Sequence, residues 1–407
     1  MSKKTIIIIS TVLGLLLIFL VVYFLFFQSG PSTPGGIISG FKSFFPFGGD
    51  NLPPPTPTSE PTPTPTPTHT PNTDFTQKLR KLSTNPVAGA GIVDTKAGSV
   101  VRYIEKATGH IFEIELFSPK QGRISNTTIP VVYNAIWGNK NNSLVSQYLK
   151  DDNRTIDTYS LAIKELSTTT ENIVSGVALP LNVNQVSALG DSIFYLEQLK
   201  DSSAGYISKF DGSSKKQIWN SPLSELLSQY VNTKIIALTT KPLSDVAGYL
   251  YFVDATTGQV KKILGDILGL ATLVNGSASQ VLYLNQENSI SLNLFNSKDN
   301  SRTNISPTTF PEKCVWSKKD ESIVYCAVPK GSLNGESLTN WYKGFILYSD
   351  DIWKYDLKNN TSNIIEDLNS DSGENIDVIK PILSENEQYL VFMNKLDNFL
   401  WSLDLTK

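Results

Sequence analysis

The fold is decided by residues 313–330, KCVWSKKDESIVYCAVPK, followed by DIWKYDL at 351–357 and TSNII at 361–365. A short run ends in a polar turn of Lys, Asp and Ser, and an apolar run with several β-branched residues follows it. An alternating run with Trp353 and Tyr355 and a short closing run complete the unit. Short β-rich runs separated by polar turns are typical of hairpins, so this stretch predicts four consecutive antiparallel strands.

The same unit recurs along the chain at a nearly fixed spacing. Its apolar runs are centred on Tyr103, Tyr148, Tyr195, Leu238, Tyr283, Tyr325 and Phe392. The intervals are 45, 47, 43, 45, 42 and 67 residues, and the last becomes 46 without residues 329–349, which show no strand pattern. A repeat of about 45 residues is typical of a four-stranded propeller blade. We therefore predict an all-β, seven-bladed β-propeller over residues 76–407, with a pair of β-sandwiches as the alternative.

The two ends of this domain complement each other. The last unit stops at Lys407 after its third strand, whereas residues 77–84, QKLRKLST, precede the first unit and read like a closing strand. Pairing these segments would close the ring and remove an exposed sheet edge. We predict that the N-terminal segment supplies the fourth strand of the last blade.

Residues 6–27, IIIISTVLGLLLIFLVVYFLFF, predict a transmembrane helix. At 1.5 Å per residue it is about 33 Å long, enough to cross a hydrocarbon core of about 30 Å. Lys3 and Lys4 precede it and the next cation is Lys42, so the positive-inside rule predicts a cytoplasmic tail at residues 1–5 and an extracytoplasmic remainder. A cleaved signal peptide is the alternative, but it needs a small-residue cleavage site that residues 24–28 do not supply.

Residues 28–75 predict a linker between the membrane and the propeller. Gly, Ser and Pro are frequent in residues 29–50, and PPPTPTSEPTPTPTPTHTP follows at 53–71. Proline fixes φ and lacks a backbone donor, so this tract predicts an extended polyproline II stalk of about 59 Å at about 3.1 Å per residue.

Two units carry the motifs of a known family. WSKKDESIVYCAV with DIWKYDL, and LSENEQYLVFMN with FLWSLDL, resemble blades of TolB-like and WD40-like β-propellers, which read Trp-Ser-Pro-Asp-Gly, an apolar strand and then apolar-Tyr-x-x-Asp. Trp316 and Ser317 match this pattern, whereas Lys318 stands in place of the proline. With RISNTTIP, GYLYFVD and KCVWS behind a single span and a stalk, the chain also resembles membrane-anchored propeller proteins of small-genome environmental bacteria. These resemblances imply fold and topology, and no activity.

Charge and composition exclude several classes of function. The 407 residues contain 35 Lys and Arg against 38 Asp and Glu, a net charge of −3 without a basic block, so we predict no nucleic-acid partner. The two histidines, His69 and His110, leave most His-dependent catalysis and zinc binding unsupported. The sequence has no Gly-x-Ser-x-Gly elbow. We predict no catalytic residue, no metal and no cofactor.

Cys314 and Cys326 are the only cysteines and flank the turn at residues 318–322. A register centred on residue 320 places them opposite each other, where antiparallel Cβ atoms lie about 4.5 to 5.5 Å apart. Because an extracytoplasmic location permits oxidation, we predict a cross-strand disulfide, with two buried thiols as the alternative.

Two stretches exceed what a minimal blade requires and supply candidate binding residues. Residues 329–349 contain Trp341, Tyr342, Phe345 and Tyr348, and residues 219–230 begin with Trp219 and end with Tyr230. One stretch joins two strands within a blade and the other joins two blades, and we predict that both emerge on the same face. Aromatic residues in long loops often anchor a binding surface. The alternative is that Trp341 and Phe345 only cover the core.

Residues 367–377, DLNSDSGENID, place oxygen ligands at alternate positions as a calcium loop does. Ser372 and Val378 replace the Gly and Glu that an EF-hand requires, so we predict a solvated acidic turn between blades.

These observations predict a single-pass protein of the cell membrane whose extracytoplasmic propeller is a non-catalytic binding or scaffolding module for a protein, peptide or glycan. The alternative is a propeller hydrolase or lyase that acts on extracellular glycan or peptide. Two or three carboxylates that converge at the centre of the ring would favour the enzyme, whereas an aromatic, weakly charged face would favour binding.

Overall fold

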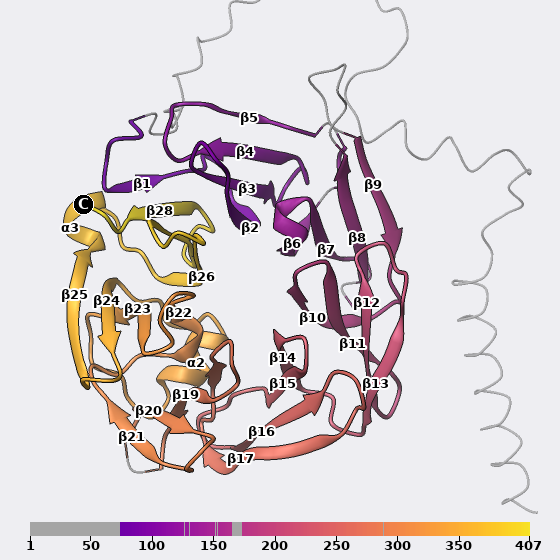
Figure 1. Ribbon diagram of the computed structural model, residues 1–407, viewed down its shortest axis with the longest axis vertical. Helices are drawn as coiled ribbons and strands as arrows, with labels where there is room; N and C mark the ends of the chain where they lie inside the picture. Colours follow the sequence, from indigo (N-terminus) through magenta and orange to yellow (C-terminus); the bar gives the residue numbers. More distant parts are fainter. Residues whose placement is uncertain are drawn as a thin grey trace, which may run out of the picture. The chain divides into compact units, whose positions relative to one another are not determined.

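The computed structural model describes residues 74–407 except 126, 130, 151, 153, 165–172 and 288. The described part contains seven four-stranded antiparallel sheets arranged in a ring, so the predicted all-β, seven-bladed propeller is confirmed (Figure 1). The predicted tail, membrane span and nearly all of the linker lie outside the described residues. Within the described ranges no helix has the length and apolar character needed to cross a membrane.

The first strand of each blade lines the inside of the ring, and the later strands follow outward in order (Figure 1). Blades 1 to 3 consist of β2 (Val87–Asp94), β3 (Ser99–Glu105), β4 (Ile111–Glu115) and β5 (Gln121–Arg123); β6 (Val132–Gly138), β7 (Ser143–Leu149), β8 (Ile156–Lys164) and β9 (Ile173–Ala178); and β10 (Val183–Leu189), β11 (Ser192–Gln198), β12 (Ser203–Lys209) and β13 (Lys216–Ser221).

The other four blades repeat this order. They consist of β14 (Leu226–Asn232), β15 (Ile235–Thr240), β16 (Ala247–Asp254) and β17 (Val260–Leu268); β18 (Thr272–Val274), β19 (Gln280–Asn285), β20 (Ser291–Asn296) and β21 (Arg302–Ile305); β22 (Cys314–Trp316), β23 (Ile323–Pro329), β24 (Asp350–Asp356) and β25 (Thr361–Asp367); and β26 (Val378–Leu383), β27 (Tyr389–Asn394), β28 (Leu400–Asp404) and β1 (Leu79–Lys81).

The ring is closed by the N-terminal segment, as predicted. β1 pairs antiparallel with β28, and Leu79, Arg80 and Lys81 lie opposite Leu403, Ser402 and Trp401. The backbone N–H of residue 82 also donates to the carbonyl of residue 400, at 2.7 Å. The last blade therefore joins the two ends of the domain, and β1 covers the edge of β28 that would otherwise be bare.

Apolar side chains fill the spaces between neighbouring blades. In the described residues, seven buried clusters each combine side chains from two adjacent blades, one cluster for every interface around the ring. Between blades 6 and 7, for example, Tyr325 and Ile352 pack with Leu383 and Phe392. Each sheet is therefore covered on both faces, which explains why a second strand such as β23, IVYCAVP, is buried from its second residue onward and reads as a continuous apolar run.

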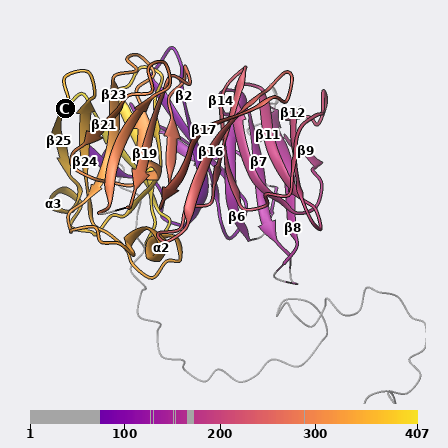
Figure 2. The same cartoon turned by 90° about the horizontal axis from the view of Figure 1, so that it is seen from below.

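Because neighbouring strands of a blade run antiparallel, successive connections emerge alternately on the two faces of the ring. Connections between the second and third strands and connections between blades leave one face of the ring, and the remaining turns leave the other. The first group includes α2 (Ser337–Tyr342), α3 (Leu368–Ser372) and the 3₁₀ helix η2 (Pro311–Lys313); η1 (Asn139–Asn141) belongs to the second group. We call the first face the α2 face (Figure 2).

Residues 329–349 differ from their prediction as a loop without regular structure, because α2 lies within them. Leu338 and Trp341 are three residues apart and both are buried against Phe310 and Leu284. A helical turn brings residues at this spacing to one face, so it lets both side chains enter the core together.

Cys314 in β22 and Cys326 in β23 are directly opposite each other in the hairpin, in the predicted register. Their Cα atoms lie 4.0 Å apart and their sulfur atoms are joined in a disulfide. Both side chains are buried in the cluster between blades 5 and 6.

Candidate binding face

Exposed apolar side chains gather on the α2 face. The described residues contain fifteen large apolar side chains that are exposed, and eleven of them lie in connections or strand ends on this face: Val131, Tyr133, Leu149, Leu181, Leu199, Leu223, Leu243, Val246, Phe345, Leu347 and Leu396. The other four are Phe75, Val177, Val260 and Ile364, of which the last three lie on outer strands. Isolated exposed apolar residues are normal, so it is their concentration on one face that makes this face the candidate interaction surface.

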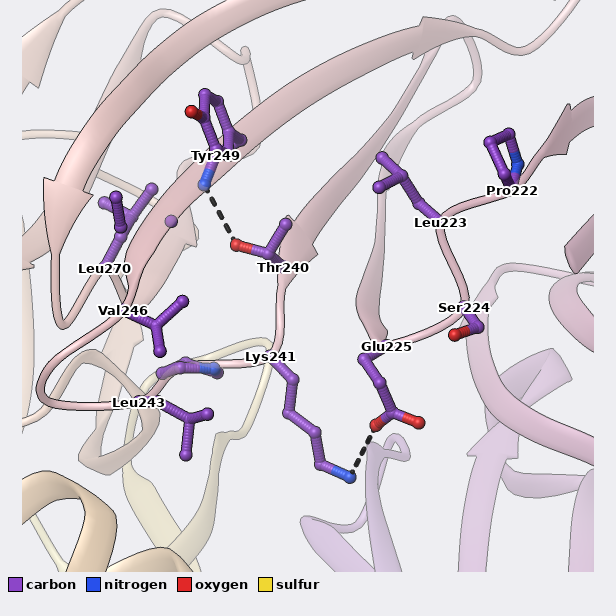
Figure 3. Close-up of a pocket in the computed structure, with 13 residues that line it drawn as sticks. Pro222, Leu223, Ser224, Glu225, Thr240, Lys241, Leu243, Val246, Tyr249 and Leu270 are labelled. Atoms are coloured by element: carbon purple, nitrogen blue, oxygen red, sulfur yellow. Dashed lines mark hydrogen bonds and ion pairs between the residues drawn. The ribbon is translucent and has the colours of Figure 1, made fainter. Parts of the chain in front are cut away.

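A groove of about 390 Å³ opens on this face beside blade 4 (Figure 3). The side chains of Leu223, Leu243, Val246 and Leu270 supply its apolar lining. They come from the connection before β14, the connection between β15 and β16, and the segment before β18. The volume lies in the range of small-molecule and side-chain pockets, about 300 to 1,000 Å³.

Polar groups lie at the rim of this groove. Lys241 Nζ lies 3.1 Å from Glu225 Oε2, and both side chains are more than half exposed. The backbone N–H of Tyr249 donates to Thr240 Oγ1 at 2.9 Å, as Figure 3 shows. An apolar centre with a polar, solvated rim is the usual anatomy of a protein interface.

α2 is tied to the wall of the groove. The backbone N–H of Ser244 donates to Thr339 Oγ1 at 2.8 Å, and the backbone N–H of Thr339 donates to Ser244 Oγ at 3.2 Å. Ser244 follows Leu243 in the connection that forms one side of the groove. Residues 329–349, which originate in blade 6, therefore reach across to blade 4.

The predicted binding residues of this segment separate into buried and exposed groups. Trp341 is 4% exposed and packs against Phe310, with ring centroids 5.2 Å apart, and Tyr348 packs on the same ring at 5.9 Å. The hydroxyl of the half-buried Tyr342 donates to Glu312. Phe345, by contrast, is 75% exposed. Trp341 thus covers the core, because its ring has its apolar partners inside the domain, and Phe345 is the aromatic ring that the segment presents to solvent.

Trp219 and Tyr230 also lie elsewhere than predicted. Trp219 belongs to β13 and is 6% exposed, and Tyr230 belongs to β14 and is half-buried between blades 3 and 4. Only residues 222–225 of this stretch form the connection, and they line the groove. Trp219 and Tyr230 lie in strands and not in the connection because their rings fill the space between blades 3 and 4.

The sequence contained a signal for the groove that aromatic residues did not reveal. Pro222-Leu223-Ser224 and Pro242-Leu243-Ser244 are two copies of Pro-Leu-Ser, each followed by an acidic residue. Both copies line the groove except for Ser244, which binds α2. A repeated Pro-Leu in two connections predicts paired, rigid loops that expose an apolar side chain.

A buried ion cluster holds residues 329–349 in place. Lys313 Nζ lies 2.5 Å from Asp350 Oδ2 and also contacts Asp377 Oδ1, and all three side chains are at most 1% exposed. The Nε1–H of Trp341 donates to Asp377 Oδ2 at 3.0 Å, and the backbone N–H of Tyr348 donates to the same oxygen at 3.0 Å. The segment is thereby fastened to blade 7 at both its helix and its C-terminal half.

Burial raises the pKa of the Asp350 carboxyl to about 6, with a further increase from the Asp377 charge, although Lys313 opposes the shift. Asp350 Oδ1 is buried without a hydrogen-bond partner, whereas Oδ2 accepts the backbone N–H of Val378 at 2.7 Å. An oxygen without a hydrogen-bond donor in a site closed to water destabilises the charged carboxylate, in agreement with the direction of the pKa shift.

This cluster corrects the prediction of a solvated acidic turn at residues 367–377. Asp367 is indeed at the surface, where its side chain accepts the backbone N–H of Ser370 and caps α3. Asp377 is buried because Lys313, Trp341 and Tyr348 supply it with donors. Among the described residues no group of three or more His, Cys, Asp or Glu side chains is placed to hold a metal ion.

No protein-family model matches the chain, and no curated protein matches its sequence. Among solved structures it is similar to TolB from Acinetobacter baumannii, with 12% identity, a TM-score of 0.41 and coverage of 77% of this chain and 63% of TolB. It is also similar to oligogalacturonate lyase from Vibrio parahaemolyticus, with 10% identity, a TM-score of 0.48 and coverage of 78% and 97%. A third structure, oligogalacturonate lyase in complex with manganese, shows 9% identity, a TM-score of 0.40 and coverage of 80% of both chains.

The chain spans less than two thirds of the TolB chain to which it is similar. The propeller fold that the motifs predict is shown by the seven four-stranded sheets themselves. At these identities the likeness concerns the fold alone.

Proposed function

We propose that this chain is a membrane-anchored, extracytoplasmic β-propeller that binds a protein partner through the α2 face without catalysing a reaction. The observation that carries the proposal is the concentration of exposed apolar side chains on that face, with an apolar groove among them. The rim charges Glu225 and Lys241 neutralise each other, so the groove favours a weakly charged, apolar partner surface.

The anchoring of residues 329–349 supports this role. Thr339 ties α2 to blade 4, while the Lys313 cluster ties the same segment to blade 7. Exposed residues such as Phe345 and Leu347 are therefore presented from a segment that is ordered before a partner arrives. Pre-organised loops lose less conformational entropy on binding, which favours affinity.

The charged groups give the alternative, a hydrolase or lyase, less support. In the described residues, the seven inner strands contain only two charged side chains, Asp94 and Lys380. Asp94 accepts hydrogen bonds from the Ser99 hydroxyl and the backbone N–H of Asn386, both at 2.6 Å. A pair of convergent carboxylates, which acid–base chemistry on a glycosidic or peptide bond would use, is not formed there.

Site-specific photo-crosslinking in cells that express the full chain tests the binding face. A photoreactive phenylalanine analogue at Leu243 or Phe345 should form a defined crosslink to one partner. The same analogue at Val260 is the matched control, because Val260 is 50% exposed on the outer strand of the same blade as Leu243. Crosslinks only at Val260, or equal yields at all three positions, would refute the proposal.

The membrane anchor has a separate test. Deleting residues 6–27 should move the chain from the membrane fraction to the soluble fraction. In intact cells with the full chain, added chymotrypsin should cut at the exposed Phe345, because the propeller is proposed to lie outside. A membrane-bound deletion variant, or complete protection of the intact chain from protease, would contradict the proposed topology.

A further inference from the structure

A second cavity, which shares no lining residue with the groove, lies on the inner side of the ring. It has a volume of about 360 Å³ and is lined from the inner strands β2, β6, β10 and β26 and from blade 7. Most of its lining is apolar, including Ile136, Val186, Ile382 and Met393. Lys380 is the charged side chain among the residues that line it.

The backbone of β26 is bent where it carries Lys380. Ile379 lies opposite Met393 and Ile382 lies opposite Val391, so two residues of β26 face one residue of β27 in a β-bulge. Lys380 has a φ of 51° and precedes Pro381, although a non-glycine residue, and one before proline in particular, rarely adopts this conformation. Bulges redirect a side chain, and strained backbone of this kind is often found at functional sites.

The Lys380 side chain extends from blade 7 past blade 1 to blade 2. Its Nζ donates to the carbonyl of Ala88 at 2.9 Å and to Asn134 Oδ1 at 2.7 Å. Both acceptors are neutral, and an ammonium group has three N–H donors. The amide nitrogen of Asn134, Nδ2, donates to Gln147 Oε1. The cavity therefore offers a cation with one N–H beyond those two contacts.

Within the described part of the chain, Lys380 forms no ion pair with a carboxylate. Burial among protein atoms lowers the pKa of its ammonium to about 8, and the positive charge of Lys106 lowers it further. Lys380 as a residue is nevertheless exposed to solvent, and it lines the cavity. Of the charges on the inner strands of the described part, Asp94 is engaged by Ser99 and Asn386. An anion bound in the cavity would therefore pair with the Lys380 ammonium and neutralise its charge.

We propose that this cavity binds a small organic acid, with its carboxylate on Lys380 Nζ and its aliphatic chain against the apolar lining. One lysine matches one negative charge, whereas a phosphate group is usually held by several donors or by arginine. Ile136, Val186 and Met393 favour an aliphatic body over a sugar, whose hydroxyl groups would lack partners. This site is independent of the α2 face, since its lining residues come from other parts of the ring.

The test measures binding of hexanoate and of hexanamide to the full chain in lipid nanodiscs by calorimetry, with empty nanodiscs as the blank. The two probes have the same chain and differ in charge. We expect hexanoate to bind at least tenfold more tightly, and we expect Lys380→Met to abolish this preference. Lys261→Met removes an exposed lysine from the outer strand β17 and should change nothing. Equal affinity for the two probes, or an unchanged preference in Lys380→Met, would overturn the proposal.

A second measurement does not depend on the folding of any variant. Acetylation of each lysine by an N-hydroxysuccinimide ester is followed by peptide mass spectrometry, with and without hexanoate. Hexanoate should slow acetylation of Lys380 at least threefold and leave Lys261 unaffected, and an unchanged rate at Lys380 would refute the site. A leucine-terminated tripeptide and its C-terminal amide form another arm: stronger protection by the peptide acid than by hexanoate identifies a peptide C terminus as the carboxylate source, and the reverse identifies a free acid.

Discussion

Replacing Lys313 by Met tests whether the buried ion cluster holds the domain and its binding segment together. Lys313 and Asp350 are fully buried, and Asp377 is 1% exposed. Methionine keeps most of the length of the side chain but removes the ammonium that bridges the two carboxylates. Both carboxylates would then share a site closed to water without that cation.

The expected loss of unfolding free energy in Lys313→Met follows from two estimates. Removing one partner of a buried ion pair costs about 3 to 5 kcal/mol, because the other charge stays buried. The chain can relieve part of this cost by protonating Asp350, whose pKa is already raised to about 6, so that protonation at pH 7 costs only about 1.4 kcal/mol beyond what the wild type bears. We therefore expect Lys313→Met to lower the free energy of unfolding by about 4 kcal/mol at pH 7. At pH 5 the Asp350 carboxyl is already largely protonated in the wild type, so the loss should be smaller by about 1 kcal/mol.

Urea unfolding of the full chain, followed by tryptophan fluorescence at pH 7 and pH 5, measures both values. Lys241→Met is the matched control, because Lys241 forms an ion pair of 3.1 Å with Glu225 at the surface and its loss should cost less than about 1 kcal/mol. The triple variant Lys313→Met, Asp350→Asn and Asp377→Asn should recover much of the stability, since it removes the buried charges together. Chymotrypsin should cut Lys313→Met faster at Phe345, because Asp377 holds the segment that carries it.

A Lys313→Met chain as stable at pH 7 as Lys241→Met would show that the cluster contributes nothing to stability. An equal loss at pH 5 and pH 7 would show that the carboxylates do not titrate in this range. Either result would refute the reasoning.

Four further predictions follow from the structure. In the wild type, the folded-state pKa of Asp350 is raised from 3.8 to about 6, so its contribution to stability is fully present below pH 3.8 and is lost as the pH rises through 6. The loss is about 3 kcal/mol, and Asp350→Asn should flatten this part of the stability-against-pH curve. Trp341→Ala should cost about 3 to 5 kcal/mol in urea unfolding because the ring is buried, whereas Phe345→Ala should change stability by less than about 0.5 kcal/mol; similar losses in both variants would contradict the assignment of Trp341 to the core. Reducing the disulfide of Cys314 and Cys326, which are 12 residues apart, should lower stability by about 3 kcal/mol in the chain-entropy model without unfolding the domain, as circular dichroism and thermal melting would show; unfolding on reduction would argue against that estimate. A chain that begins at Asn85 lacks β1 and should aggregate in size-exclusion chromatography, because β28 loses its neighbour; a stable monomer would mean that closure is dispensable.

The blade architecture was accessible from the sequence because its determinants are local. Each blade is built from strands that pair with the next strand along the chain, so period, turn chemistry and apolar runs recur within about 45 residues. The register of Cys314 opposite Cys326 is local for the same reason, since one short turn determines it. Closure by residues 77–84 was also predictable, because one strand was missing at one end and one was in excess at the other.

The candidate binding face was harder to predict from the sequence, because aromatic residues in this fold either fill the core or lie exposed at the surface. Trp219, Trp341 and Phe345 each have both polar or small residues and large apolar or aromatic residues as close neighbours in the sequence, so the local sequence does not distinguish them. Only packing decides that Trp219 fills a blade interface, that Trp341 rests on Phe310 and that Phe345 is exposed. The apolar residues of the groove are single leucines and valines in connections, which periodicity cannot detect.

The sequence by itself determined the number of blades, the pairing of the cysteines and the way the ring closes, because each depends on neighbouring strands and on turns of a few residues. Only the tertiary structure decided which side chains share a site. Thr339 binds Ser244 across 95 residues, Lys313 bridges Asp350 and Asp377 across 37 and 64, and Lys380 reaches Asn134 across 246. The physical reason is that a closed ring brings the connections of different blades together on its α2 face and the inner strands together around its centre, and the distances between them depend on the whole ring and on no local segment.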